Sequence, residues 1–270
     1  MRILFVADVI GSPGRKTVKA LLHLVRKETR ADAVVLNGEN AAGGFGITPE
    51  IVREFLDLGV DVITTGNHVW DKKEILPVLD REPRLLRPAN YPPGNPGRGS
   101  VTVQVGGKQL AVLNLQGRTF MPPVDDPFRA ADALLDEIRE QADFVVVDFH
   151  AEATSEKQAL AHYLDGRVAA VVGTHTHVQT ADQRVLPKGT AAITDLGLTG
   201  SLGGVIGMKA EISIQRQILL ARGERMQPAD DDLHLQGVVV EIDPAGGRAR
   251  SIERLSVPYA RALQGAFGRV

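Results

Sequence analysis

Residues 169–180, AAVVGTHTHVQT, form an apolar run that ends in His175 and His177, two histidines separated by a single threonine. Residues 143–157, DFVVVDFHAEATSEK, follow the same design, with His150 directly after the apolar part. Short β-branched runs of this kind are typical of strands that are buried on both faces. Alternation along an extended chain also places His175 and His177 on the same side of the backbone. We therefore expect two buried strands whose ends carry imidazoles.

The same pattern recurs at four other places in the chain. The runs are ILFVADVIG at residues 3–11, AVVLNGENAAGG at 33–44, VDVITTGNHVWD at 60–71 and AAITDLGLTG at 191–200. Helical patterns lie between several of them, at residues 13–28, from Pro49 onward behind a Thr48 cap, at 125–140 and at 155–164. This alternation of strands and helices predicts an α/β fold.

Two other segments have the pattern of antiparallel hairpins. Gly106 and Gly107 separate residues 100–105 from 109–115, and residues 243–247 separate 235–242 from 248–255. The combination predicts two packed, mixed β-sheets flanked by helices. No stretch of the sequence reads as a domain boundary, so we expect a single domain over residues 1–270.

The composition narrows the classes of function. Apolar residues make up 43% of the 270 residues, and the formal net charge of -2 gives no reason to expect duplex DNA or an anionic membrane as a partner. The sequence has no cysteine, which excludes thiolate ligands and a cysteine nucleophile and fits a reducing cytoplasm. The N-terminal apolar run is far shorter than the roughly 20 residues of a membrane helix. We expect a cytoplasmic protein without a membrane segment; homo-oligomerisation is left open.

Polar side chains follow the apolar runs one after another. In open α/β sheets, ligands bind beyond the carboxyl ends of the strands. The candidates offer carboxylate, amide and imidazole donors: Asp8, Glu39, Asn40, Asn67, His150, His175 and His177. Mixed oxygen and imidazole donors suit Mn, Fe or Zn better than Ca or Mg. Two cations about 3.5–4 Å apart stabilise both the attacking and the leaving oxygens of a phosphoryl transfer, so the set predicts a two-metal site that hydrolyses phosphoesters.

Each residue has another interpretation when it is taken alone. Asp8 is compatible with a helix cap, and Glu39 with a polar turn before two glycines. His150 alone is typical of a hydrogen-bonded buried histidine. Asp71 either orients His68 or caps a helix that begins at residue 72. The recurrence of the pattern favours the metal site over these separate interpretations. The other histidines are interpreted as helix or surface residues without function: His23, His162 and His234.

In order and spacing, these motifs resemble those of the calcineurin-like metallophosphoesterases. The resemblance rests on Asp8, Gly38-Glu39, Gly66-Asn67-His68-x-x-Asp71, His150 and Gly173-x-His175-x-His177. The chain is similar to the YmdB-like branch of bacterial phosphodiesterases along nearly its full length, through ADVIG, NGENAAGGFGIT, TTGNHVWDKKEI, NLQGRTFM, DFHAEATSEK, VVGTHTHVQTAD and TDLGLTG. The resemblance implies an αββα sandwich.

The sequence departs from the superfamily pattern at two positions. The first motif usually reads Asp-x-His, but Ile10 stands at the histidine position, and Glu39 replaces a bridging aspartate. In the YmdB-like branch an asparagine after the glutamate takes the vacant ligand position, which Asn40 matches. The resemblance then implies two ligand sets: Asp8, Glu39, Asn40 and His177 for one metal, and Glu39, Asn67, His150 and His175 for the other. An amide is a weaker ligand than an imidazole, so we expect the first metal to bind less tightly or to be a harder ion.

The resemblance also implies a reaction. A hydroxide bridging two metal ions, iron or manganese with zinc as an alternative, would attack a phosphodiester in line, and His68 would protonate the leaving oxygen. The implied substrates are 2′,3′-cyclic nucleotides. Two other classes stay open: a different two-metal phosphomonoesterase or nuclease, and a regulatory metal- or nucleotide-binding protein with incidental turnover.

Two neighbouring features are compatible with substrate binding. The glycine-rich loop at residues 41–46 either lets backbone approach a phosphate, with Phe45 stacking on a base, or is a flexible turn. Arg118 suits phosphate binding or, with somewhat more weight, a surface position.

Overall fold

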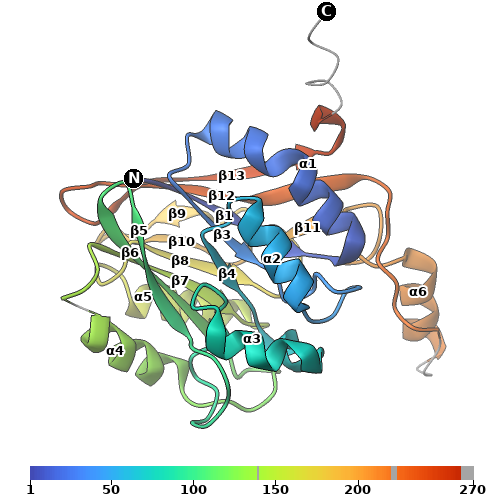
Figure 1. Cartoon of the computed structure of the whole chain (residues 1–270), viewed down its shortest axis with the longest axis horizontal. Coiled ribbons are helices and arrows are strands. Elements are labelled where there is room, and N and C mark those ends of the chain that lie inside the picture. Colours follow the sequence, from blue (N-terminus) through green and yellow to red (C-terminus); the bar gives the residue numbers. More distant parts are fainter. Residues whose placement is uncertain (139, 220–223, 263–270) are drawn as a thin grey trace, which may run out of the picture.

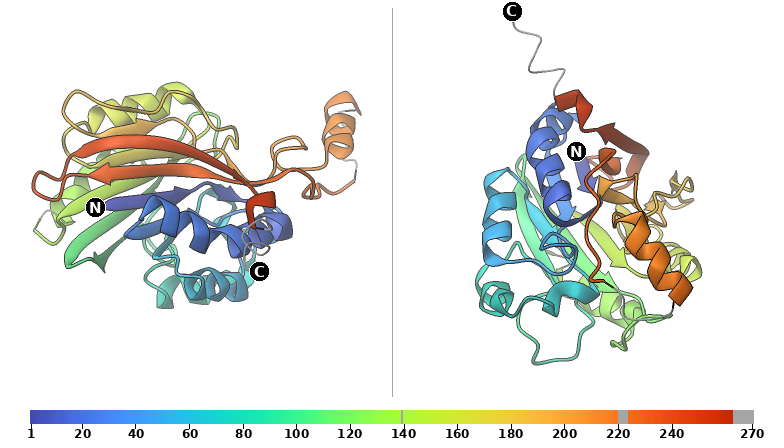
Figure 2. Two further views of the ribbon diagram at one scale, coloured as in Figure 1. Left: turned by 90° about the horizontal axis from the view of Figure 1, so that it is seen from above. Right: turned by 90° about the vertical axis from the view of Figure 1, so that its right-hand side faces the viewer.

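The computed structural model describes residues 1–138, 140–219 and 224–262, and these form four layers (Figure 1). Two mixed β-sheets pack face to face, and helices cover the outer face of each sheet, as Figure 2 shows from two further directions. The predicted fold class of two packed, mixed sheets flanked by helices is confirmed. The single domain over residues 1–270 stays a prediction, and residues 263–270 lie outside the described part.

The first sheet contains seven strands, some paired in parallel and others antiparallel. Its order is β2-β11-β12-β1-β3-β4, and β13 pairs with β12. The strands β1, β3 and β4 are parallel to one another, whereas β12 runs antiparallel to both β1 and β11. The bounds are β1 Arg2–Val6, β2 Asp8–Val9, β3 Ala33–Asn37, β4 Val62–Thr64, β11 Leu198–Ser201, β12 Leu233–Ile242 and β13 Ala249–Pro258.

The second sheet contains six strands in the order β5-β6-β7-β8-β10-β9. Its central strands β6, β7, β8 and β10 are parallel, and the two edge strands are antiparallel to their neighbours. The bounds are β5 Ser100–Val105, β6 Lys108–Gln116, β7 Phe144–His150, β8 Ala170–Thr174, β9 Arg184–Val185 and β10 Ala191–Ile193. Both predicted hairpins are present, as β5–β6 and β12–β13.

Alternate residues of β1 contribute to different hydrophobic cores. Ile3 and Phe5 pack between the two sheets, in the same cluster as Val146 of β7. Leu4 and Val6 point the other way, into the cluster that α1 and α2 cover. Complete burial of side chains of this size stabilises a fold by about 1.5–3 kcal/mol each. A strand buried on both faces therefore anchors two layers at once, which explains why its sequence lacks polar alternation.

The helices follow the predicted segments with shifted ends. Their bounds are α1 Gly11–Thr29, α2 Pro49–Asp57, the short 3₁₀ turns Asn67–Trp70 and Lys73–Ile75, α3 Leu76–Arg81, α4 Pro127–Ile138, α5 Thr154–Tyr163 and α6 Ala210–Leu219. The Thr48 hydroxyl accepts a hydrogen bond from the amide of Ile51, as expected of an N-cap. The predicted segment 125–140 reaches residue 139, which lies outside the described part. The helix α6, which stands away from the sheets in Figure 2, was not predicted.

The carboxyl ends of strands from both sheets meet at one edge of the molecule. Asp148 of β7 accepts a hydrogen bond from Asn37 Nδ2 at 3.3 Å and another from the hydroxyl of Thr64. Asn37 ends β3 and Thr64 ends β4, so these contacts join the two sheets. All three side chains are buried. The loops that follow these strands are therefore held close together.

Candidate metal centre

The structure brings the seven predicted ligand residues to this shared edge. Asp8 lies in β2, directly after β1, and His150 is the last residue of β7. The remaining five lie in the turns after three other strands: Glu39 and Asn40 after β3, Asn67 after β4, and His175 and His177 after β8. Asp8, Glu39 and His150 are fully buried. Side chains that are distant in sequence thus share one enclosed space.

Three of these side chains are imidazoles, and each has one nitrogen bound to an acceptor on the outer side of the cluster. His150 Nδ1 lies 3.0 Å from Thr174 Oγ1, and the Thr174 hydroxyl donates to Asp148 Oδ1 at 2.7 Å. His177 Nδ1 lies 3.0 Å from the Ile206 carbonyl oxygen, and His175 Nε2 lies 3.1 Å from a Glu152 carboxylate oxygen. A hydrogen on each of these outer nitrogens leaves a lone pair on the inner one.

The inner nitrogens of two histidines converge with a carboxylate and an amide. His150 Nε2 lies 3.0 Å from His175 Nδ1, 3.1 Å from Glu39 Oε1 and 3.0 Å from Asn67 Oδ1. Ligand atoms of Glu39, His150 and His175 all lie within 4.8 Å of one another. Two imidazole lone pairs that face each other at this distance repel unless a proton or a cation lies between them, and a metal cation there is coordinated by both. These four residues are suited to hold one metal ion.

A second group of donors adjoins the first. His177 Nε2 lies 3.8 Å from Asp8 Oδ2 and 3.2 Å from Asn40 Nδ2, and Asn40 Nδ2 lies 3.1 Å from Glu39 Oε1. A half-turn of the Asn40 amide presents its oxygen in place of its nitrogen. Asp8 Oδ1 is buried and has no hydrogen-bond partner among the described residues. Because a buried carboxylate oxygen without a partner is costly, this orphaned atom fits a cation site.

Within the cluster, Glu39 and His150 shift each other's pKa. Burial acts to raise the pKa of Glu39, but the charge of His150, its hydrogen bond to Glu39 and the contributions of His68 together outweigh burial and lower the pKa to about 2. Burial acts to lower the pKa of His150, but the charge and hydrogen bond of Glu39 together with the charges of Asp8 and Asp148 outweigh burial and raise the pKa to about 9. Burial, together with the charge of His150, lowers the pKa of His175 to about 3. Burial also raises the pKa of Asp8. A proton on His150 thus occupies the place that a metal cation would take.

The backbone of the His175–His177 turn is strained. His175 has a φ of 101° and His177 a φ of 63°, in the left-handed region that residues other than glycine rarely adopt. Close packing also restricts the turn before Asn67, because a Cβ atom added to Gly66 would lie 2.1 Å from His150 Cδ2. Such strain persists where surrounding contacts hold the chain in place, and it is common at functional sites.

His68 lies at the rim of the cluster. Its backbone amide donates to Glu39 Oε2 at 3.2 Å, and its Nδ1 lies 2.8 Å from Asp71 Oδ2. Of the two interpretations of Asp71, the structure shows the contact with His68; the 3₁₀ turn at Lys73–Ile75 has no side-chain cap. Phe45 packs edge-on against the His68 ring, with the ring centroids 5.0 Å apart. The side chain of His68 is 29% exposed, so it can reach a bound molecule.

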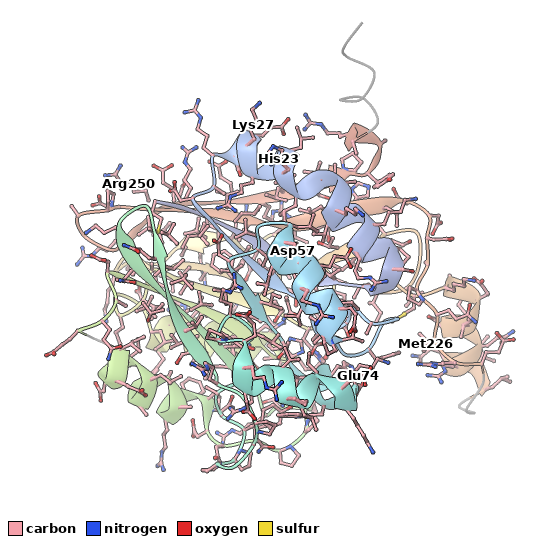
Figure 3. All side chains as sticks on the ribbon, in the orientation of Figure 1. His23, Lys27, Asp57, Glu74, Met226 and Arg250 are labelled. Carbon is pink, nitrogen blue, oxygen red and sulfur yellow. The ribbon has the colours of Figure 1, made fainter. Side chains whose placement is uncertain are left out.

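Other candidates lie apart from the cluster. Arg118 forms an ion pair with Asp126 at 3.1 Å, with nearly half of its side chain exposed, as expected of a surface position. His23 lies on the exposed face of α1 (Figure 3). The hydrogen-bond partners of His162 and His234 are not residues of the candidate metal centre. The sequence interpretation missed Thr174, Asp148 and Glu152, although all three lie within two residues of a ligand histidine.

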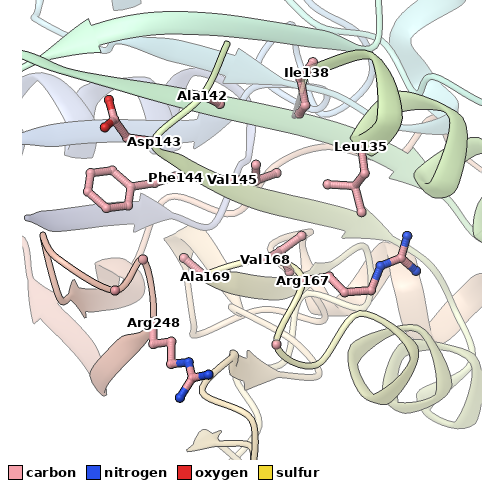
Figure 4. Close-up of a pocket in the computed structure, with 13 residues that line it drawn as sticks. Leu135, Ile138, Ala142, Asp143, Phe144, Val145, Arg167, Val168, Ala169 and Arg248 are labelled. Atoms are coloured by element: carbon pink, nitrogen blue, oxygen red, sulfur yellow. The ribbon is translucent and has the colours of Figure 1, made fainter. Parts of the chain in front are cut away.

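Two cavities lie at different distances from the cluster. One of about 430 Å³ is lined by Asp143 to Val145 and Arg167 to Ala169 (Figure 4). These residues lie at the amino ends of β7 and β8, at the edge opposite the histidines. The other, of about 400 Å³, is lined by His177 itself together with Ser201 and Arg254. Only the second of these two adjoins the candidate ligands. No helix in the described part of the chain is long and apolar enough to cross a membrane.

Comparisons with known proteins show which proteins the chain resembles. Residues 4–255 match the family model described as YmdB-like protein. The chain is 51% identical over 257 residues to a 2′,3′-cyclic-nucleotide 2′-phosphodiesterase of Bacillus subtilis, covering 95% of this chain and 97% of the relative. A crystal structure described as a novel phosphatase of Mycoplasma pneumoniae superposes with a TM-score of 0.89 at 33% identity, covering 98% and 96% of the two chains. The calcineurin-like phosphoesterase YfkN of Bacillus subtilis shares the fold, with a TM-score of 0.58 at 12% identity over 96% and 91%.

Proposed function

The chain belongs to the YmdB-like family and has a metallophosphoesterase fold, and on that premise we propose that it is a metal-dependent phosphodiesterase acting on 2′,3′-cyclic nucleotides. The observation that carries the proposal is the convergence of the inner nitrogens of His150 and His175 on Glu39, beside the orphaned oxygen of Asp8. The identity of 51% with a phosphodiesterase of that specificity supports the substrate class.

We assign the donors to two metal ions. One would be held by Glu39, Asn67, His150 and His175, whose ligand atoms already lie together. The other would be held by Asp8, Glu39, Asn40 and His177. Iron or manganese suits this mixture of oxygen and imidazole donors, with zinc as the alternative. When bound, the two cations supply Lewis-acid activation of the phosphoryl group and of a water molecule.

Residues of the chain itself supply the remaining steps. His68 is the proton donor to the leaving oxygen, because it lies beside Glu39 and is partly exposed. Asp71 holds Nδ1 of His68, which leaves Nε2 to face the substrate. The cavity beside His177 provides space for the nucleoside part of the substrate, with Ser201 and Arg254 on its wall. As the composition suggests, we place the enzyme in the cytoplasm.

The test combines metal analysis with a panel of phosphoesters. The purified protein, loaded with manganese or iron, is offered a 2′,3′-cyclic nucleotide, a linear dinucleotide and a nucleoside 5′-monophosphate. We expect two metals per chain and the highest kcat/KM for the cyclic nucleotide. Glu39→Gln should lose both metals and the activity, whereas His162→Ala, which removes a remote imidazole, should keep them. Less than one metal per chain together with no hydrolysis would overturn the proposal.

The same panel tests a second candidate function. The Mycoplasma pneumoniae structure is described as a phosphatase, which favours action on phosphomonoesters. A higher kcat/KM for the 5′-monophosphate than for either diester would establish that activity instead. A regulatory role without turnover is tested by complementation: if Asn67→Ala hydrolyses none of the esters yet restores the wild-type phenotype to a deletion strain, binding rather than catalysis is the biological role.

A further inference from the structure

A buried ion pair lies next to the candidate metal centre. Lys157, in α5, is 4% exposed, and its Nζ lies 2.8 Å from Oδ2 of Asp195, whose side chain is 1% exposed. Neither residue is among the assigned ligands. Removing two charges from water carries a desolvation penalty that can exceed their mutual attraction, so a buried ion pair is weak evidence for a stabilising role. Its location suggests a role in geometry.

The carboxylate of Asp195 also holds the turn between two ligand histidines. Oδ2 accepts a hydrogen bond from the Thr176 amide at 3.0 Å and one from the Thr176 hydroxyl at 2.7 Å. Oδ1 accepts one from the Gly197 amide at 2.9 Å. Thr176 stands between His175 and His177. One carboxylate therefore connects α5, the turn after β8 and the turn after β10.

This connection acts where the backbone is strained. A left-handed conformation is unfavourable for a residue other than glycine, and both His175 and His177 adopt one. Without a contact at Thr176, the turn would relax toward ordinary φ values and both imidazoles would rotate away. The other anchors act at the two ends: the His175 amide donates to Asp8 Oδ2 at 3.0 Å, and the His177 ring binds the Ile206 carbonyl.

We propose that Asp195, paired with Lys157, is a positioning residue that fixes the His175–Thr176–His177 turn and thereby sets the affinity for both metal ions. This inference rests on the proposed metal site. Because His175 and His177 are assigned to different metals, disturbing Thr176 affects both. Replacing a single-site ligand such as Asn40 or Asn67 affects mainly one. The loss of both affinities together is the signature of the proposed role.

The test measures metal binding as well as activity. Asp195→Asn is compared with the wild type and with Asp165→Asn, a matched control. Asp165 is also buried, and it accepts hydrogen bonds from the amides of Lys188 and Thr190 in a remote loop. We measure the stoichiometry and Kd for Mn²⁺ by calorimetry and the visible spectrum of the Co²⁺-loaded protein. Loss of an outer hydrogen-bond partner weakens metal binding by about 10–100-fold.

We expect Asp195→Asn to weaken both Mn²⁺ sites by a factor in that range and to change the Co²⁺ spectrum. Asp165→Asn should bind both ions as the wild type does, even if its Tm falls. Wild-type affinity in Asp195→Asn, or a loss no larger than in Asp165→Asn, would overturn the inference. If the wild type itself binds no metal, the proposed function fails instead, so the two failures are distinguishable.

A second pair of variants covers the case in which Asp195→Asn does not fold. Thr176→Val removes the hydroxyl bond to Asp195 but keeps the amide bond, whereas Thr176→Ser keeps both. We expect Thr176→Val to weaken both metal sites to a smaller extent than Asp195→Asn, and Thr176→Ser to restore wild-type binding. Equal metal affinity in the two threonine variants would contradict the proposed role of this contact.

Discussion

Nδ1 of His150 lies 3.0 Å from Oγ1 of Thr174, and through that hydroxyl the imidazole is connected to the buried carboxylate of Asp148. The same carboxylate accepts from Asn37 and Thr64 of the other sheet. The chain of contacts fixes which nitrogen of His150 faces the cluster, and it ties that choice to the packing of the two sheets. The orientation of the His150 ring therefore depends on how the two sheets pack together.

The Thr174 hydroxyl provides the first prediction. In Thr174→Val the His150 ring loses its acceptor and Asp148 loses a donor. We expect metal binding to weaken by about 10–100-fold and the free energy of unfolding to fall by about 1–3 kcal/mol, since a buried acceptor is left without its partner. Calorimetry and urea denaturation measure both. Thr174→Ser keeps the hydroxyl and serves as control; unchanged metal affinity in Thr174→Val would contradict the prediction.

The close approach of Gly66 to His150 provides the second. In Gly66→Ala the new methyl group would meet the His150 ring at 2.1 Å, and the ring has no space to retreat because it is fully buried. We expect loss of metal binding and a destabilisation of about 1–3 kcal/mol. Gly246→Ala is the matched control, because its added methyl would have a nearest contact of 3.4 Å in an exposed hairpin turn. Gly66→Ala with wild-type metal content would show that the turn yields more easily than its packing indicates.

Metal removal provides the third prediction. A ligand that binds only the folded state stabilises it by about 2.7 kcal/mol at one hundred times its Kd, which corresponds to a rise in Tm of roughly 5–10 °C for a chain of this size. We expect a chelator to lower the Tm of the wild type and added Mn²⁺ to restore it. Glu39→Gln, which loses the carboxylate shared by both ligand sets, should melt at one temperature under both conditions. A wild-type Tm that changes with neither the chelator nor added Mn²⁺ would contradict the presence of a bound cation that stabilises the fold.

The ligand residues were predictable from sequence because parallel strands deliver them to one edge. His150, His175 and Asn67 each stand within a few residues of the end of an apolar run, so locating the runs located the side chains. The start of α1 was harder to predict from the sequence. The helix begins at Gly11 rather than residue 13, and Gly11 has a φ of 56° and donates its amide to the Asn40 carbonyl. Asn40 lies in the turn after β3, so the contact joins segments that are distant in sequence, and no pattern around Gly11 predicts it.

The partners of the ligands were also beyond local patterns. Thr174 and Glu152 lie within two residues of a histidine in the sequence, but nothing in their spacing says which imidazole nitrogen they contact. Asp195 lies 19 positions beyond Thr176, and their contact depends on β8 and β10 being neighbours. Likewise, the insertion of β12 between β1 and β11 reflects long-range pairing. Strand existence can be read from the sequence, whereas strand order and outer contacts are properties of the assembled sheets.

Acid stability provides the fourth prediction. The Asp132 carboxylate accepts hydrogen bonds of 2.6 Å from the Tyr163 hydroxyl and from Arg167, and these bonds hold its pKa below the ordinary value. A depressed pKa in the folded state contributes stability above the unfolded-state pKa, and that stability is lost as the pH falls through the folded-state value. Asp132→Asn should therefore lower the free energy of unfolding at neutral pH by about 1 kcal/mol or less, and by less still near pH 3. Urea denaturation across this range measures the difference; a difference that does not change with pH would contradict the assignment.

The role of His68 provides the last prediction, and two substrates separate proton donation from binding. A general acid typically contributes about 10²–10⁴-fold to the rate of a reaction. The leaving oxygen of a strained 2′,3′-cyclic phosphate needs less assistance than that of an unstrained linear diester. We expect His68→Ala to lower kcat for the linear diester by a factor in this range and kcat for the cyclic nucleotide by less, with metal content unchanged. Asp71→Asn, which weakens the contact that orients the ring, should show the same ordering with smaller losses. His162→Ala, which removes a distant imidazole, should leave both substrates unaffected. Equal losses on the two substrates in His68→Ala would mean that the residue orients the phosphate rather than protonating the leaving group, because orientation serves both esters alike.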